Sequence, residues 1–219
     1  MTPLDTLDIP SVALTCTPEV LIVRSQQPLE VLSSAVVGGG FVRVRYLLNR
    51  HVHRDYNCAE PVADLVACAR RHGITEDFVG QMTAVSLHKA RVMTVRADGL
   101  TVAVVATARL SNTATSGLSP VAIAGPGTIN MILLIDGRLT PAAMVNAVIT
   151  TTEVKTQVLM ARGIRTPEGH AATGTSTDAM AVACTGRGSF LPYAGPVTLV
   201  GWLIGRCVRT ALEDALAQG

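Results

Sequence analysis

The order of strand-like and helix-like segments is the feature that most constrains the fold. Strand-like runs come early in the chain, and the longest helical pattern comes late. The predicted strands cover residues 12–17, 20–24, 32–37, 41–48, 91–96, 100–110, 128–135 and 179–185. Gly38-Gly39-Gly40 predicts a hairpin because glycine adopts positive φ, and Ala97-Asp98-Gly99 predicts a second one.

Capping residues and prolines mark three predicted helices. Residues 60–73 predict a helix with Pro61 in its first turn and Gly73 as C-cap. Thr140-Pro141 predicts the start of a long helix to about Gly163, and Gly195-Pro196 that of a last helix to about Ala217. The grouping indicates the α+β class: one domain over residues 1–219, with an antiparallel or mixed sheet covered by long helices rather than a doubly wound parallel sheet.

Composition excludes several classes of protein. Hydrophobic residues make up 48% of the 219 residues and aromatic ones 3%, so the chain should fold around Val, Ala, Leu and Ile. A net charge of +2 without basic runs argues against a nucleic-acid partner. The uncharged stretches 110–135 and 188–205 contain prolines, and the N-terminus lacks the basic and apolar regions of a signal peptide. We therefore expect a cytoplasmic protein without membrane contact, and the composition is compatible with a homo-oligomer.

The cysteines and histidines give no complete metal-binding motif. Five cysteines, an odd number without a C-x-x-C pair, indicate small apolar residues in a reducing compartment. His51 and His53 are two residues apart and would share a strand face, but they need a third ligand from elsewhere. We therefore predict no metal site and no cofactor.

A hydroxyl-rich segment, residues 172–179, precedes a short apolar run. In an extended conformation, Thr173, Thr175 and Thr177 lie on one face, while Ser176 and Asp178 lie on the other. Such residues form turns that lead into a buried strand. Alternatively, hydroxyls beside a carboxylate bind a polar substrate or supply an activated nucleophile.

Two further sets of polar residues lie in apolar surroundings. Along the long predicted helix, one face carries Asn146, Thr150, Glu153 and Gln157, either as its solvated edge or as the wall of a polar cavity. Lys155 lies about 200° around the helix from Glu153, so the two form no intrahelical pair. Asn49, Asn112 and Asn130 end or interrupt apolar strands. Each amide caps a turn, or all three meet in a polar site where amides donate to a developing oxyanion.

Taken in order, several segments resemble the adenosylcobinamide amidohydrolase family of corrinoid salvage. The matching segments are SSAVVGGG (33–40), Asn49 with Val52 and Tyr56, GQMTA (80–84), SNTA (111–114), GTINMIL (127–133), AMVNA (143–147), TEVKT (152–156) and ATGTSTDAMAVA (172–183). The sequence departs from the family pattern at Gln81, where an apolar residue is expected, and at Val154, where alanine is common.

The resemblance implies an enzyme with a small-molecule corrinoid as substrate. Such an enzyme hydrolyses the aminopropanol amide of adenosylcobinamide and releases adenosylcobyric acid for cobalamin biosynthesis. Two alternatives stay open: a non-catalytic corrinoid-binding protein, and a self-processing amidase that frees an N-terminal Thr175 by cleavage after Gly174.

Amide hydrolysis needs a base, oxyanion donors and an acid for the leaving amine. On the helix, an apolar setting makes Glu153 our first choice as base, and Asp178 is the second. Thr175, Ser176 and Thr177 are either nucleophiles or substrate-binding groups, and we favour direct attack by water. The predicted substrate-binding residues are Asn49, His51 (also a proton shuttle), Thr83, Asn112, Asn130, Asn146 and Ser176.

Overall fold

The computed structural model describes residues 7–121 and 127–217. Most of residues 1–10, to which the signal-peptide prediction applies, lies outside the described ranges. The main sheet contains β1 (Val12–Cys16), β2 (Val20–Ser33), β3 (Gly40–His51), β4 (Phe78–Thr83), β5 (Arg91–Ala97), β6 (Leu100–Arg109), β8 (Thr128–Ile135) and β11 (Ala179–Cys184). The short strands are β7 (Thr113–Ala114), β9 (Arg138–Leu139), β10 (Gly174–Thr175) and β12 (Phe190–Leu191). The helices are α1 (Pro61–Arg71), the 3-10 helix η1 (Leu87–Lys89), α2 (Pro141–Ala161) and α3 (Leu199–Leu216).

The sheet is mixed, which confirms the predicted α+β class. Its strand order is β4-β3-β2-β11-β8-β6-β5, with β1 paired to β2. The pairs β3–β4 and β11–β8 are parallel, and the other pairs in the sheet are antiparallel. The late strand β11 therefore lies in the middle of the sheet, between β2 and β8.

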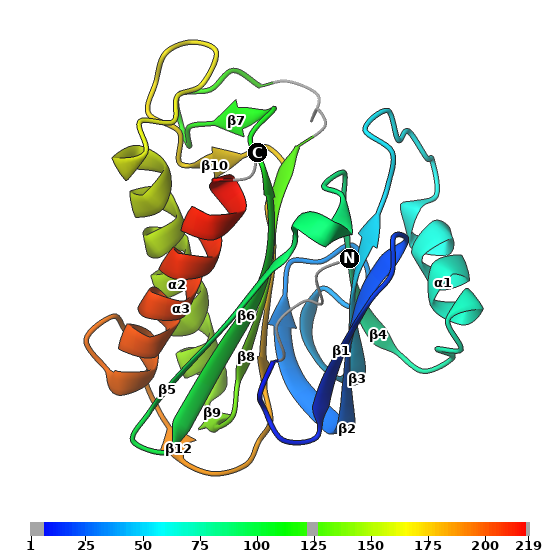
Figure 1. Ribbon diagram of the computed structural model, residues 1–219, viewed down its shortest axis with the longest axis vertical. Helices are drawn as coiled ribbons and strands as arrows, with labels where there is room; N and C mark the ends of the chain where they lie inside the picture. The colour runs from blue at the N-terminus through cyan, green and yellow to red at the C-terminus, as the bar shows by residue number, and fades with distance from the viewer. Residues whose placement is uncertain (1–6, 122–126, 218–219) are drawn as a thin grey trace.

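Helices cover the same face of the sheet at its two ends, on opposite sides of the molecule (Figure 1). α2 and α3 pack side by side on β5, β6, β8 and β11, where a core of aliphatic side chains includes Val104, Leu133 and Leu203. α1 lies on the far side, where Leu65 packs with Leu48 and Phe78. None of the helices in the described ranges combines the length and apolar character that a membrane crossing requires.

Buried amides connect strands that are not neighbours in the sheet. Asn130 of β8 donates through Nδ2 to the Asn49 Oδ1 of β3 at 3.0 Å and to the Met82 carbonyl of β4 at 2.7 Å. Asn49 donates in turn to Thr107 Oγ1 of β6 at 3.0 Å. Because β11, β2 and β3 separate β8 from β4 in the strand order, these bonds require the sheet to curl until its two halves face each other. We call Asn49, Thr107 and Asn130 the amide bridge.

The local signals predicted most elements within a few residues. Thr140 caps α2 by accepting the Ala143 N–H at 3.0 Å, and α1 begins with Pro61. Two predictions were wrong, and one strand was missed. Residues 20–24 and 32–37 are not separate strands, because β2 runs through a bulge between Arg24 and Leu29. β4 was not predicted, and α3 begins after Thr198, which caps it through Gly201 N–H at 3.1 Å, rather than at Pro196.

Three of the five cysteines are buried, as expected of small apolar side chains. All five are free thiols, and Cys68, Cys184 and Cys207 are buried. Burial raises the pKa of the Cys207 thiol to about 12. That thiol therefore stays protonated and acts as a small apolar side chain of α3.

The amide bridge should stabilise the folded protein measurably. Asn130→Ala leaves Asn49 Oδ1 and the Met82 carbonyl without their donor in a buried setting, and Asn130 itself is 1% exposed. We expect the free energy of unfolding to fall by about 1–3 kcal/mol for each group left unpaired. Chemical denaturation checks this. The control Asn146→Ala, outside the bridge on α2, should change stability by about 0.5 kcal/mol or less. Equal losses in the two variants contradict the bridge's role.

Candidate functional site

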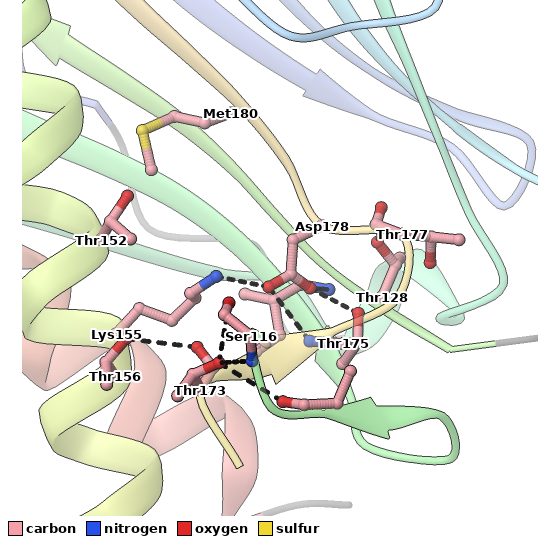
Figure 2. Close-up of polar contacts among 12 residues, drawn as sticks. Ser116, Thr128, Thr152, Lys155, Thr156, Thr173, Thr175, Thr177, Asp178 and Met180 are labelled. Carbon is pink, nitrogen blue, oxygen red and sulfur yellow. Dashed lines mark hydrogen bonds and ion pairs between the residues drawn. The ribbon is translucent and has the colours of Figure 1, made fainter. Parts of the chain in front are cut away.

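The carboxylate of Asp178 accepts four hydrogen bonds from three segments of the chain. Oδ1 accepts from the Ile129 N–H at 3.0 Å and from the Thr175 hydroxyl, and Oδ2 accepts from Lys155 Nζ at 2.5 Å and from the Thr175 N–H at 3.2 Å. Figure 2 shows Lys155 reaching from α2 toward Asp178. An ionised carboxylate offers about four lone-pair positions, so all acceptor sites of Asp178 are occupied. We call Lys155, Thr175 and Asp178 the Thr-Asp-Lys cluster.

Regular elements hold Lys155 and Thr175, and Asp178 lies directly before another. Thr175 lies in β10, which pairs with β7 through Thr175 and Thr113. Lys155 projects from α2, and Asp178 directly precedes β11. The side chains of Lys155 and Asp178 are 12% and 18% exposed, so they form a largely buried ion pair that still reaches the surface.

Further hydroxyls surround Lys155 and β10 (Figure 2). Thr156 Oγ1 donates to the Thr173 carbonyl at 3.2 Å, and the Ser116 N–H donates to Thr173 Oγ1 at 3.1 Å. These bonds join α2 and the segment after β7 to the strand that carries Thr175. The hydroxyl-rich segment predicted from the sequence is therefore both a turn before a buried strand and a polar cluster.

Gly174 allows the cluster to close. A Cβ at this position would lie 2.5 Å from Asp178 Oδ2 and 2.9 Å from Lys155 Nζ. Neither atom can move away without breaking the ion pair between them. A residue without a side chain is therefore needed beside this ion pair.

Several predicted site residues lie along one chain of contacts. The amide bridge continues from Asn130 Oδ1 to Thr128 Oγ1 at 2.8 Å, and this hydroxyl also lies 2.8 Å from the Thr177 carbonyl. Asn112 Nδ2 donates to Ser176 Oγ at 2.7 Å. The structure thus brings Asn112, Ser176 and Thr177 beside the Thr-Asp-Lys cluster and connects them to Asn49 and Asn130.

The amides themselves face the protein interior. Asn49 and Asn130 are 3% and 1% exposed, and their Nδ2 groups already donate within the core. Thr83, 1% exposed, accepts the Val85 N–H at 3.1 Å, and the half-buried His51 places Nδ1 3.1 Å from the Val85 carbonyl. Asn49 and Asn130 therefore bond within the core, and Thr83 and His51 bond Val85, so none of these contacts reaches the Thr-Asp-Lys cluster directly.

Two predicted residues lie outside these contacts. Glu153 is exposed, and with Gln157, Trp202 and Arg206 it lines a groove of about 390 Å³ between α2 and α3. Its surroundings are therefore not the apolar setting expected from the sequence. Asn146 is half-buried earlier on α2. β3 ends at His51, so His53 lies beyond the strand, where it is exposed and pairs with Asp55 at 3.4 Å.

Sequence reasoning missed Lys155 as a site residue. Glu153 and Lys155 are the charged residues of the 21-residue helix α2, and a charge in so apolar a helix is a signal by itself. The apolar setting expected along this helix favoured the Glu153 carboxylate as a base instead. The helical spacing correctly placed Lys155 and Glu153 on different faces of the helix. It gave no information on Asp178, the partner of Lys155, which lies outside the helix.

The close approach at Gly174 gives a prediction about packing. Gly174→Ala places a methyl group against the Lys155–Asp178 contact, and such overpacking costs about 1–3 kcal/mol. Thermal and chemical unfolding should show this loss. Gly195→Ala is the matched control, because a Cβ there meets no atom within 4 Å, and it should be nearly neutral. A Gly174→Ala protein as stable as the parent contradicts the tight packing described above.

Comparison with known proteins agrees with the family resemblance. The family model described as adenosylcobinamide amidohydrolase matches residues 4–219. A protein of Methanosarcina mazei named adenosylcobinamide amidohydrolase is 31% identical over 207 residues, which are 90% of this chain and 94% of that protein. One of the same name from Halobacterium salinarum is 36% identical over 122 residues, 52% of this chain and 50% of that protein.

Among solved structures, the PH0078 protein from Pyrococcus horikoshii aligns with a TM-score of 0.47 and 11% identity, over 90% of this chain and 77% of that one. The family assignment depends on the sequence matches. The match covers nearly the whole chain, and a relative above 30% identity spans nine tenths of it. The chain belongs to the adenosylcobinamide amidohydrolase family, as its sequence motifs predicted.

Proposed function

We propose that this protein hydrolyses the aminopropanol amide of adenosylcobinamide, releasing aminopropanol and adenosylcobyric acid, at the Thr-Asp-Lys cluster. Family membership supports the substrate and the reaction class. The observation that supports the site is the hydrogen bond from the Thr175 hydroxyl to Asp178 Oδ1. Lys155 donates to the other oxygen of the same carboxylate, Oδ2. The reaction belongs to corrinoid salvage and feeds cobalamin biosynthesis.

The contacts favour Thr175 as a nucleophile over the direct attack by water that the sequence suggested. Asp178 has no acceptor site left for a water molecule, whereas the proton of Thr175 already points at its carboxylate. Ser176 is exposed and bonds Asn112, and the Thr177 hydroxyl donates to the Gly127 carbonyl. Of the three hydroxyls, Thr175 is therefore the one that is paired with a carboxylate.

In the proposed step, Thr175 Oγ1 attacks the amide carbon and its proton passes to Asp178. Negative charge thereby moves from the carboxylate to the carbonyl oxygen of the substrate. The Lys155 ammonium, which neutralises Asp178 in the resting state, is then free to stabilise this oxyanion. Asp178 returns the proton to the leaving aminopropanol nitrogen, and the C–N bond breaks to leave an ester on Thr175.

A water molecule completes the reaction. It attacks the ester carbon while its proton passes to Asp178, and cleavage of the ester bond returns a proton to Thr175 Oγ1. The products are adenosylcobyric acid and the regenerated hydroxyl. No metal ion or cofactor takes part in the proposed steps.

Substitutions in the cluster test this mechanism. Thr175→Ala and Asp178→Asn should lower the rate of aminopropanol release by on the order of 10³-fold or more, whereas Thr175→Ser should keep part of it. Thr152→Ala is the matched control, because Thr152 is an exposed hydroxyl of α2 that bonds the Val148 carbonyl. Its rate should equal that of the parent.

Mass spectrometry separates this mechanism from its alternatives. Rapid quenching should trap an acyl adduct on Thr175, and the resting protein should have the mass of the intact 22.9 kDa chain. Turnover lost only in part in Thr175→Ala, with no adduct, favours attack by water. Cleavage after Gly174 supports self-processing, and stoichiometric corrinoid binding without amine release supports a binding protein.

A second substitution decides the role of Glu153. Because this carboxylate is exposed in the α2–α3 groove, we expect Glu153→Gln to keep the hydrolysis rate within a few-fold of the parent. Steady-state assays across pH check this. If the folded variant instead loses 10²–10⁴-fold in rate, the loss has the size of general base catalysis, and Glu153 rather than Asp178 is the base.

A further inference from the structure

The side of the molecule away from α2 carries a thiol, an imidazole and a carboxylate that the proposed hydrolysis does not use. Cys68 lies on α1, and His72 follows one turn later at the end of the helix. Glu19 belongs to the turn between β1 and β2. One ligand atom of each residue lies within 4.8 Å of the other two. Figure 1 places α1 on the opposite side of the molecule from α2 and α3.

We propose that Glu19, Cys68 and His72 form a binding site for one divalent transition-metal ion of the Zn²⁺ type. Thiolate sulfur, imidazole nitrogen and carboxylate oxygen are the three ligand types that zinc uses in proteins. Mg²⁺ and Ca²⁺ prefer oxygen ligands alone, so the thiol and the imidazole argue against them. Three protein ligands leave the fourth tetrahedral position for water.

The carboxylate of Glu19 is already oriented for this role. Arg71 contacts its Oε1, while Oε2 lies 3.2 Å from His72 Nε2. An ion bound between Oε2, Nε2 and the Cys68 sulfur replaces the Glu19–His72 contact and leaves Arg71 on the outer oxygen. Partners outside the ligand shell commonly hold ligating carboxylates in this way. The side chains need to close to metal–ligand distances of about 2.0–2.3 Å.

Charge and exposure are compatible with entry of a cation. The two nearby guanidinium groups are paired, Arg71 with Glu19 and Arg50 with Asp64. Cys68 is fully buried, whereas the side chains of His72 and Glu19 are 25% and 41% exposed. The ion would therefore reach the thiol from the solvent side, passing between the imidazole and the carboxylate.

Cobalt(II) is the probe for this site, because a Co²⁺–thiolate bond gives a charge-transfer band and tetrahedral Co²⁺ gives intense d–d bands. We expect chelator-treated full-length protein to bind one equivalent of Co²⁺ with both signatures, and Zn²⁺ to displace it. Binding to the folded state alone should also raise the melting temperature in proportion to the logarithm of the Zn²⁺ concentration. Cys68→Ser and His72→Gln should each abolish the charge-transfer signal or weaken Co²⁺ binding at least tenfold.

Two controls use the same residue types outside the cluster. Cys58→Ser and His53→Gln remove an exposed thiol and an exposed imidazole, and both should leave Co²⁺ binding unchanged. If Cys68→Ser does not fold, the partly exposed His72→Gln carries the test. Absence of saturable binding, or a signal that persists in His72→Gln and disappears in Cys58→Ser, overturns the proposal. Hydrolysis is not the readout, so the outcome is independent of the mechanism proposed above.

Discussion

The saturated carboxylate of Asp178 is the contact on which the candidate site depends. Its donors come from the start of β8, from α2 and from β10, so one side chain fixes the relative position of three elements. Without Asp178, the Lys155 ammonium would remain 12% exposed without its counter-ion, which is more costly than losing an exposed ion pair. The same contact therefore contributes to the stability of this end of the molecule and presents the Thr175 hydroxyl.

The amide bridge has a related role in the interior. Asn49, Thr107 and Asn130 are polar residues in the curled sheet, and each is 3% exposed or less. Directional hydrogen bonds at this point favour one arrangement of the two halves, whereas aliphatic packing alone tolerates small shifts. Asn130 lies next to Ile129, whose N–H donates to Asp178. The bridge therefore also fixes the position of the β8 backbone that holds the Asp178 carboxylate.

Local sequence signals predicted elements well where the cause of the structure is local. Thr140 and Pro141 start α2 because a capping hydroxyl and a fixed φ act within one turn. β4 gave no such signal. Because both of its faces are buried, its sequence has no alternation of apolar and polar residues, and Gly80 and Gln81 also break its apolar run. At α3, Pro196 resembled a first-turn proline, yet Thr198 supplies the cap.

The same division applies to the site. Thr175 and Asp178 could be found because they are three residues apart in a segment rich in hydroxyls. The Lys155–Asp178 pair spans 23 residues and two elements, so it depends on how α2 packs beside β10 and β11. Glu153 was predicted as the base from the apolar pattern of its helix. Its exposure follows from the position of α3, which a helical periodicity does not reveal.

The central place of β11 has a consequence for how the protein matures. The strands β1–β4 come from the first 83 residues and β5–β8 from residues 91–135, but β2 and β8 are joined through β11 alone in the strand order. The two half-sheets therefore become one continuous sheet only when residues 179–184, the last of the main sheet's strands to be synthesised, pair with both β2 and β8. Such a late, non-local pairing slows folding. It also means that a chain shortened before this strand lacks both a continuous sheet and the carboxylate of Asp178.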